Sequence, residues 1–168
     1  KFPLVLGGDC SILLGSALAL RERGRYGLLF VDGHADLLTP ASSQSGGAAG
    51  MDLALATGLG PALLTDIDNK KPYIQPEDTI VFGYRQPPPG DTSPVAPQPP
   101  MGAFPFHSIQ QRGIAESARL AVNHLESAPT VGFWIHVDVD VLNTESMPAV
   151  DSPETGGMTP QELSTLLK

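Results

Sequence analysis

Residues 26–36 read YGLLFVDGHAD, an apolar run that ends in the polar side chains of Asp32, His34 and Asp36. An uninterrupted apolar run is typical of a parallel strand that is covered on both of its faces. Alternate residues of an extended backbone project to the same side, so these three polar side chains can point the same way. Ligands of open α/β sheets bind beyond the carboxyl ends of the strands. The stretch therefore predicts a buried strand that leads directly into a binding site.

A second acidic cluster follows another apolar run. Residues 131–140 read VGFWIHVDVD, and Asp138 and Asp140 share one side of the extended chain. Four carboxylates that met at one edge of a sheet would repel one another, because like charges in a partly dry site cannot all stay ionised. Divalent cations between them would remove this conflict. The two clusters together predict a metal site that holds two cations.

Apolar runs of strand length alternate with segments of helical periodicity, which predicts an α/β fold with a mostly parallel sheet. We expect strands near residues 2–6, 26–32, 79–84 and 131–138, and helices near residues 11–23, 51–58, 114–127 and 160–168. The Pro-rich segment 87–100 is expected to be a surface loop, with a lid as the alternative.

The two ends of the sequence predict one domain, residues 1–168, that is truncated at both ends. The chain opens almost directly on its first expected strand. Near the other end, Thr159, Pro160 and Glu162 form the pattern of a capping box with proline at the first helical position. A helix with so strong a start is not expected to stop within a few residues, so we expect the chain to be a fragment of a larger domain.

Composition and net charge limit the classes of protein to which this sequence can belong. A hydrophobic content of 41% with 17% charged residues is typical of a globular protein. The net charge of −8 argues against nucleic acid as a partner, because a phosphate backbone requires clustered Lys and Arg. No apolar run reaches the roughly 20 residues of a membrane span. The one cysteine excludes an internal disulfide framework and fits a reducing compartment, so we expect a cytoplasmic protein.

Four motifs in order carry a resemblance to a known family. They are GGDCS at residues 7–11, DGHAD at 32–36, DVDVL at 138–142 and GGMT at 156–159. This combination resembles the ureohydrolase family, which includes arginase, agmatinase and formimidoylglutamase. The resemblance implies a three-layer, doubly wound, mostly parallel α/β fold and a binuclear manganese centre. It also implies hydrolysis of a C–N bond in a small guanidino or amidine substrate, and assembly into homo-oligomers.

The resemblance implies a role for each matching residue. Asp32 and Asp138 would bridge both cations and so serve the catalytic activation of water. Asp36 and the residue at position 10 would complete the first metal site, and His34 and Asp140 the second. Two cations that share a water lower its pKa for attack on a planar carbon. Ser45 matches a position that makes a polar contact with substrate.

Departures from the family pattern leave alternatives open. Cys10 stands where the family usually has histidine, and a thiolate there would favour Zn²⁺ or Fe²⁺ over Mn²⁺. Alternatively, Cys10 is a small buried residue and the first site is weak or empty. Leu38 falls at a family position that hydrogen-bonds the carboxylate of the amino acid, which argues against free L-arginine as the substrate. Ala49 falls where arginases have a histidine proposed as a proton shuttle. The rival hypothesis is a catalytically silent binding or regulatory protein. A binuclear phosphatase is a weaker alternative, because the sequence lacks a phosphate-binding Arg/Lys cluster.

Other polar residues have structural interpretations. We expect Asp9 to cap the helix that begins near Ser11. His136 shares a side of its strand with Asp138 and is interpreted as a core histidine whose hydrogen bonds are satisfied, with a role beside the metal site as the alternative. Asp52 is interpreted as the acidic residue in the first turn of a packed helix.

Overall fold

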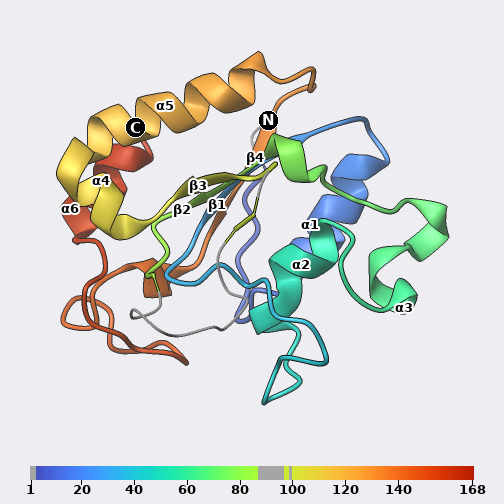
Figure 1. The fold of residues 1–168 in the computed structure, drawn as a ribbon, viewed down its shortest axis with the longest axis horizontal. Helices are drawn as coiled ribbons and strands as arrows, with labels where there is room; N and C mark the ends of the chain where they lie inside the picture. The colour runs from blue at the N-terminus through green and yellow to red at the C-terminus, as the bar shows by residue number, and fades with distance from the viewer. Residues whose placement is uncertain (1–2, 87–96, 99) are drawn as a thin grey trace.

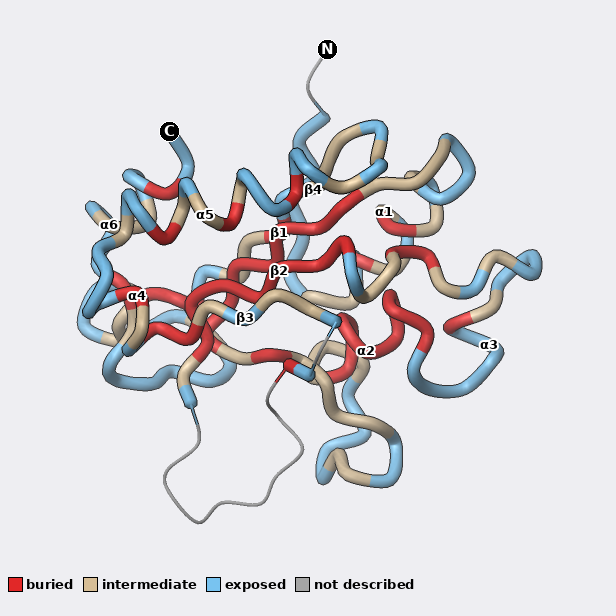
Figure 2. Tube along the Cα trace, turned by 45° about the horizontal axis from the view of Figure 1, so that its top comes forward, coloured by how far each residue is buried: buried red, intermediate tan, exposed pale blue. Residues whose placement is uncertain are grey.

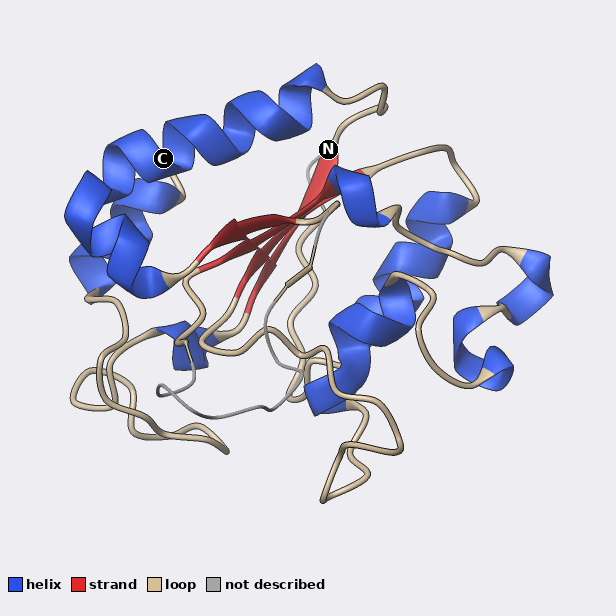
Figure 3. Cartoon of the chain, viewed as in Figure 1, coloured by secondary structure: helices blue, strands red, loops and turns tan. Residues whose placement is uncertain are grey.

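The computed structural model describes residues 3–86, 97–98 and 100–168. Its sheet has four strands: β1 (Gly27–Val31), β2 (Thr79–Phe82), β3 (Gly102–Phe104) and β4 (Phe133–Val137). They lie in the order β3-β2-β1-β4, and every neighbouring pair is parallel. The strands therefore all point the same way, and the loops that follow them gather at one end of the sheet (Figure 3). The predicted parallel α/β architecture is confirmed.

Helices follow the predicted pattern in part. The α-helices are α1 (Ile12–Arg21), α2 (Asp52–Ala56), α3 (Ala62–Thr65), α4 (Phe106–Arg112), α5 (Ile114–Ser127) and α6 (Pro160–Leu166). The sequence predicted α1, α2, α5 and α6, whereas α3, α4 and β3 were missed. The capping box at the start of α6 is present, because the Thr159 side chain accepts from the Glu162 backbone and the Glu162 side chain accepts from Thr159. None of the described helices is both long and apolar enough to cross a membrane.

Helices cover both faces of the sheet, so the molecule has three layers (Figure 1). Leu29 and Val31 of β1 face a core formed with α4, α5 and α6. Leu28 and Phe30, which alternate with Leu29 and Val31 along the strand, face a second core formed with α1 and α2. Because successive strand residues point to opposite faces, a strand between two helical layers must be apolar throughout. All five residues of β1 are buried, as the tube view shows for the central strands (Figure 2).

The prediction of a strand at residues 2–6 is wrong for residues 3–6, the part of this range that the structure describes. Residues 3–6 adopt no regular structure, and the side chains of Leu4 and Leu6 are 76% and 86% exposed. An apolar segment becomes a strand only when a neighbouring strand satisfies its backbone groups. None of the four described strands pairs with this segment. Most of the loop expected at 87–100, namely residues 87–96 and 99, lies outside the described residues.

Candidate metal centre

The pairing of β1 with β4 brings the two acidic clusters together. Val31 is in register with Val137, so Asp32 and Asp138 leave adjacent strands at the same level. The Asp138 amide continues the ladder by donating to the Val31 carbonyl at 2.9 Å. Ligand oxygens of Asp32, Asp138 and Asp140 all lie within 4.8 Å of one another. The predicted meeting of the two clusters at the carboxyl edge is confirmed.

Backbone hydrogen bonds fix the orientation of these carboxylates. The His34 amide donates to Asp32 Oδ1 at 2.7 Å, and the Asp140 amide donates to Asp138 Oδ1 at 2.8 Å. The Gly33 amide links the clusters by donating to Asp140 Oδ1 at 3.0 Å. A side chain at Gly33 would not fit, since its Cβ would lie 2.8 Å from the Asp140 carbonyl oxygen. Glycine is therefore required where the two loops approach each other.

Arg85 secures the loop that carries Asp140. Its guanidinium donates to the carbonyl oxygens of Asp140 and Leu142 at 3.0 and 3.1 Å, and to that of Thr155 at 3.1 Å. The Arg85 amide also donates to the Gly33 carbonyl at 2.9 Å. The Arg85 side chain thus ties the loop after β2 to the segment after β4, and its backbone amide adds the loop after β1.

Cys10 reaches the cluster from the segment before α1. Its thiol donates to Asp138 Oδ2 at 2.8 Å across 128 positions of sequence. Asp9 Oδ1 accepts from the Ser11 amide at 2.8 Å, which holds the turn that carries Cys10. The structure therefore brings together Cys10, Asp32, His34, Asp36, Asp138 and Asp140, in overlapping groups of ligand atoms.

Ser45 does not belong to this group of contacts. It is exposed in the loop that follows Asp36, and its hydroxyl accepts from the Gly47 amide at 3.2 Å. Its substrate contact stays a prediction.

Burial and mutual repulsion shift the titration of the cluster. Burial raises the pKa of Asp32 well above its usual range, and it raises the pKa of Asp36 to about 7. Hydrogen bonds to Asp140 and Asp32 raise the pKa of His34 to about 11, with Nδ1 2.9 Å from Asp140 Oδ2. Burial, the largest single cause, opposes the ionisation of Asp140, but the hydrogen bond and charge of His34, the Gly33 amide and Arg85 together lower its pKa. Protons therefore offset part of the negative charge of the cluster.

Two further groups lie beside the predicted residues. His136 is buried, as expected, and stacks on Phe30 with 4.9 Å between ring centroids. It is not the satisfied histidine that was expected, because its Nε2 has no hydrogen-bond partner among the described residues. Burial lowers its pKa to about 4, and its Nε2 lies within 4.8 Å of ligand atoms of Cys10 and Asp32. A carboxylate oxygen of Asp52 likewise lies within 4.8 Å of ligand atoms of Cys10 and Asp36. The sequence held one signal for Asp52: it is the only charged residue in the apolar run of residues 51–56.

The donor set fits divalent cations. Carboxylate oxygens are the hard ligands that Mn²⁺ and Mg²⁺ prefer, while the imidazole and the thiol suit transition metals. Asp32 Oδ2 is fully buried and has no hydrogen-bond partner among the described residues. An uncompensated buried carboxylate oxygen is costly unless a proton or a cation satisfies it.

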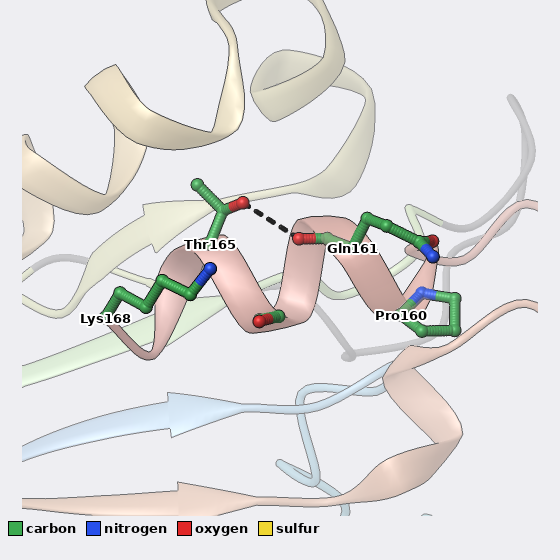
Figure 4. A pocket seen from close by; sticks show the side chains of 5 residues that line it. Pro160, Gln161, Thr165 and Lys168 are labelled. Carbon is green, nitrogen blue, oxygen red and sulfur yellow. Dashed lines mark hydrogen bonds between the residues drawn. The ribbon is translucent and has the colours of Figure 1, made fainter.

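Two surface hollows differ in their relation to the cluster. One, of about 310 Å³, runs along α6 and contains none of the candidate ligands. Its Thr165 hydroxyl donates to the Gln161 carbonyl at 2.8 Å (Figure 4). The other, of about 380 Å³, is lined by residues that include Arg85, Phe106 and Glu154. Because Glu154 Oε1 lies 3.8 Å from His34 Nε2, this second hollow adjoins the candidate metal centre.

These features define a three-layer α/β protein with a carboxylate-rich candidate metal centre at the carboxyl edge of its parallel sheet. The chain belongs to the arginase family, whose family model matches residues 1–168. An arginase of Brevibacillus brevis is 34% identical over 163 residues, which make up 96% of this chain and 54% of that protein.

Solved arginases share the fold. The crystal structure of the Bacillus cereus arginase matches with a TM-score of 0.87 and 28% identity, covering 99% of this chain and 57% of that one. The Entamoeba histolytica arginase in complex with L-ornithine matches with a TM-score of 0.78 and 28% identity, covering 93% and 53%. The chain spans about half the length of these relatives.

Proposed function

We propose that the protein is a metal-dependent hydrolase of C–N bonds in linear guanidino or amidine compounds. The observation that carries this proposal is the meeting of Asp32 with Asp138 and Asp140 in a chain of the arginase family. Asp32 and Asp138 come from adjacent strands, which suits carboxylates that bridge two cations.

The remaining candidate ligands divide into two sets. Asp36 and Cys10 would complete the first site, and His34 and Asp140 the second. Mn²⁺ is the cation that the family resemblance implies, and Zn²⁺ or Fe²⁺ are the alternatives that the thiol of Cys10 favours. When bound, a pair of such cations supplies a water of lowered pKa as the nucleophile. The residues themselves hold this chemistry in place, because backbone amides orient Asp32, Asp138 and Asp140.

The proposed substrate is a small guanidino or amidine compound other than free L-arginine. Leu38, which is half-buried, offers no polar group to an amino-acid carboxylate. Ser45 in the same loop is the proposed polar contact to substrate. We further propose that the protein works in the cytoplasm and assembles as a homo-oligomer.

A catalytically silent binding or regulatory protein is the second candidate. It is favoured by the Cys10 thiol, which donates to Asp138 Oδ2 and so occupies an oxygen that a cation would otherwise take. The apolar residues Leu38 and Ala49 agree with it, because they lack the polar groups that the family resemblance implies at these positions.

Metal analysis combined with a substrate screen tests the proposal. The protein, purified without chelator and then loaded with Mn²⁺, Zn²⁺ or Fe²⁺, is expected to hold two equivalents of cation. It is also expected to release urea or ammonia from at least one guanidino or amidine compound. Two equivalents of metal with no release from any compound would favour the silent protein. Less than one equivalent after loading would refute the metal centre itself.

Replacing Cys10 by histidine should increase affinity for Mn²⁺ by about tenfold, because imidazole is a neutral ligand that suits this cation better than a thiol. Titration with Mn²⁺, followed by electron paramagnetic resonance, measures the change. Cys10→Ser serves as the control that removes the thiol without adding an imidazole. Equal Mn²⁺ affinity in all three proteins would show that position 10 is not a ligand.

A further inference from the structure

Asp52 is a buried carboxylate that the ligand sets above leave without a role. It begins α2, and residues 51–58 around it are all buried. Its side chain is 0% exposed, and neither carboxylate oxygen has a hydrogen-bond partner among the described residues. Removing a carboxylate from water without a partner costs several kcal/mol, so a group of this kind normally has a compensating ligand or proton.

The carboxylate of Asp52 faces the candidate metal centre. Ligand atoms of Cys10, Asp36 and Asp52 all lie within 4.8 Å of one another, which is the spacing of donors around one cation. The Ala54 amide donates to the Asp36 carbonyl at 3.1 Å, so α2 is tied to the turn that carries Asp36. That turn is unusual, because Asp36 has a φ of 46°. The backbone thus holds both carboxylates in place before any ligand arrives.

A single proton shared by Asp36 and Asp52 would leave part of this arrangement unsatisfied. It would link one oxygen of each residue, while the remaining Asp52 oxygen would stay buried without a donor. A divalent cation accepts oxygens from several carboxylates at once and offsets their charge. Cys10 is placed to contribute a sulfur donor to the same cation.

Building on the proposed metal centre, we propose that Asp52 is a ligand of the first cation, the one held by Asp36 and position 10. The first site then contains an additional hard carboxylate beside the thiol of Cys10. Such a donor set takes a divalent transition-metal cation, and the extra carboxylate raises the preference for Mn²⁺ or Fe²⁺ over Zn²⁺.

Titration with Mn²⁺ alone tests this assignment. Asp52→Asn keeps the shape of the side chain but removes its charge, and should weaken the first site by about 10- to 100-fold. The second site, formed around His34 and Asp140, should lose less affinity than the first, since Asp52 lies outside its ligand set. The matched control is Asp68→Asn, because Asp68 is exposed and its φ of 55° is one that asparagine tolerates.

The outcomes separate this proposal from the one on which it rests. The assignment is supported if the wild type binds two equivalents of Mn²⁺ and Asp52→Asn has a reduced affinity for only one of them. If both proteins bind two equivalents, and Asp52→Asn binds each with the affinity of the wild type, the assignment is overturned but the proposed metal centre is retained. No binding by the wild type overturns both.

A second readout guards against a variant that does not fold. The Asp52→Glu variant keeps the carboxylate but moves it, so the visible absorption of bound Co²⁺ should change in position or intensity. Asp68→Glu should leave that spectrum unchanged. An identical Co²⁺ spectrum in the wild type and Asp52→Glu would overturn the assignment, because a displaced ligand must alter the field at the cation.

Discussion

Replacing Asp32 by asparagine is expected to abolish the binding of both cations while leaving the metal-free protein at least as stable as the wild type. Asp32 is 0% exposed, and its Oδ2 has no hydrogen-bond partner among the described residues. The neutral amide therefore replaces a carboxyl group whose ionisation burial disfavours and whose Oδ2 no described protein group compensates. As a proposed bridge, Asp32 serves both cations, so its loss should reduce affinity by about 100-fold or more at each site. Any hydrolysis of guanidino compounds should fall with it.

Asp78→Asn is the matched control for this experiment. Asp78 is as deeply buried as Asp32, at 1% exposure, but Arg25 Nη2 donates to its Oδ1 at 3.0 Å. Neutralising it breaks an ion pair, so stability should fall by about 1 kcal/mol, with Mn²⁺ binding unchanged. Thermal unfolding in EDTA and Mn²⁺ titration give the two readouts. If Asp32→Asn lost stability as Asp78→Asn does and kept its metal, Asp32 would be a structural residue.

The sequence predicted the acidic cluster well because strand geometry is local. Apolar runs before Asp32 and Asp138 fix both as parallel strands, and the carboxyl ends of parallel strands meet at one edge. The register that sets these residues side by side could not be read from the sequence, since β1 and β4 are about a hundred residues apart. The role of Arg85, whose guanidinium holds the segment after β4, was not predicted from the sequence.

Other elements escaped prediction for identifiable reasons. β3 has only three residues and follows the Pro-rich segment, so neither length nor periodicity marks it. Residues 3–6 carry a strand pattern, but a strand depends on a neighbour that local sequence does not specify. Asp52 was assigned to the first turn of a packed helix, which is correct for α2. What the local pattern could not show is that this helix turns its first side chain toward Asp36.

The metal-free protein should lose stability as the pH rises above neutrality. Burial raises the pKa of Asp36 to about 7 and that of Asp52 to about 10. A carboxyl whose folded pKa is raised binds a proton in the folded state that the unfolded state has already released, so stability falls as pH rises toward the folded pKa. His34 acts in the same direction: its pKa is raised to about 11, and its stabilisation is complete below about pH 6.5 and is lost above it. His136 opposes this trend only below about pH 6.5, because its pKa is lowered to about 4.

Between about pH 6.5 and about pH 8.5 only the falling contributions remain. Asp52 and His34 each contribute about 2–3 kcal/mol over this interval, so we expect a loss of about 5 kcal/mol, or about 10–20 °C in Tm. Bound Mn²⁺ should reverse the slope, since cations displace the protons that the cluster otherwise retains, and so the Mn²⁺-induced gain in Tm should grow across the same interval. Thermal unfolding with EDTA or with Mn²⁺ at both pH values measures the two slopes. Asp52→Asn should flatten the metal-free slope, because it removes one of the retained protons, whereas Asp68→Asn should not. A metal-free Tm that rises with pH over this interval would mean that the carboxylates of the cluster are already compensated within the protein, and the electrostatic need for cations would disappear with it.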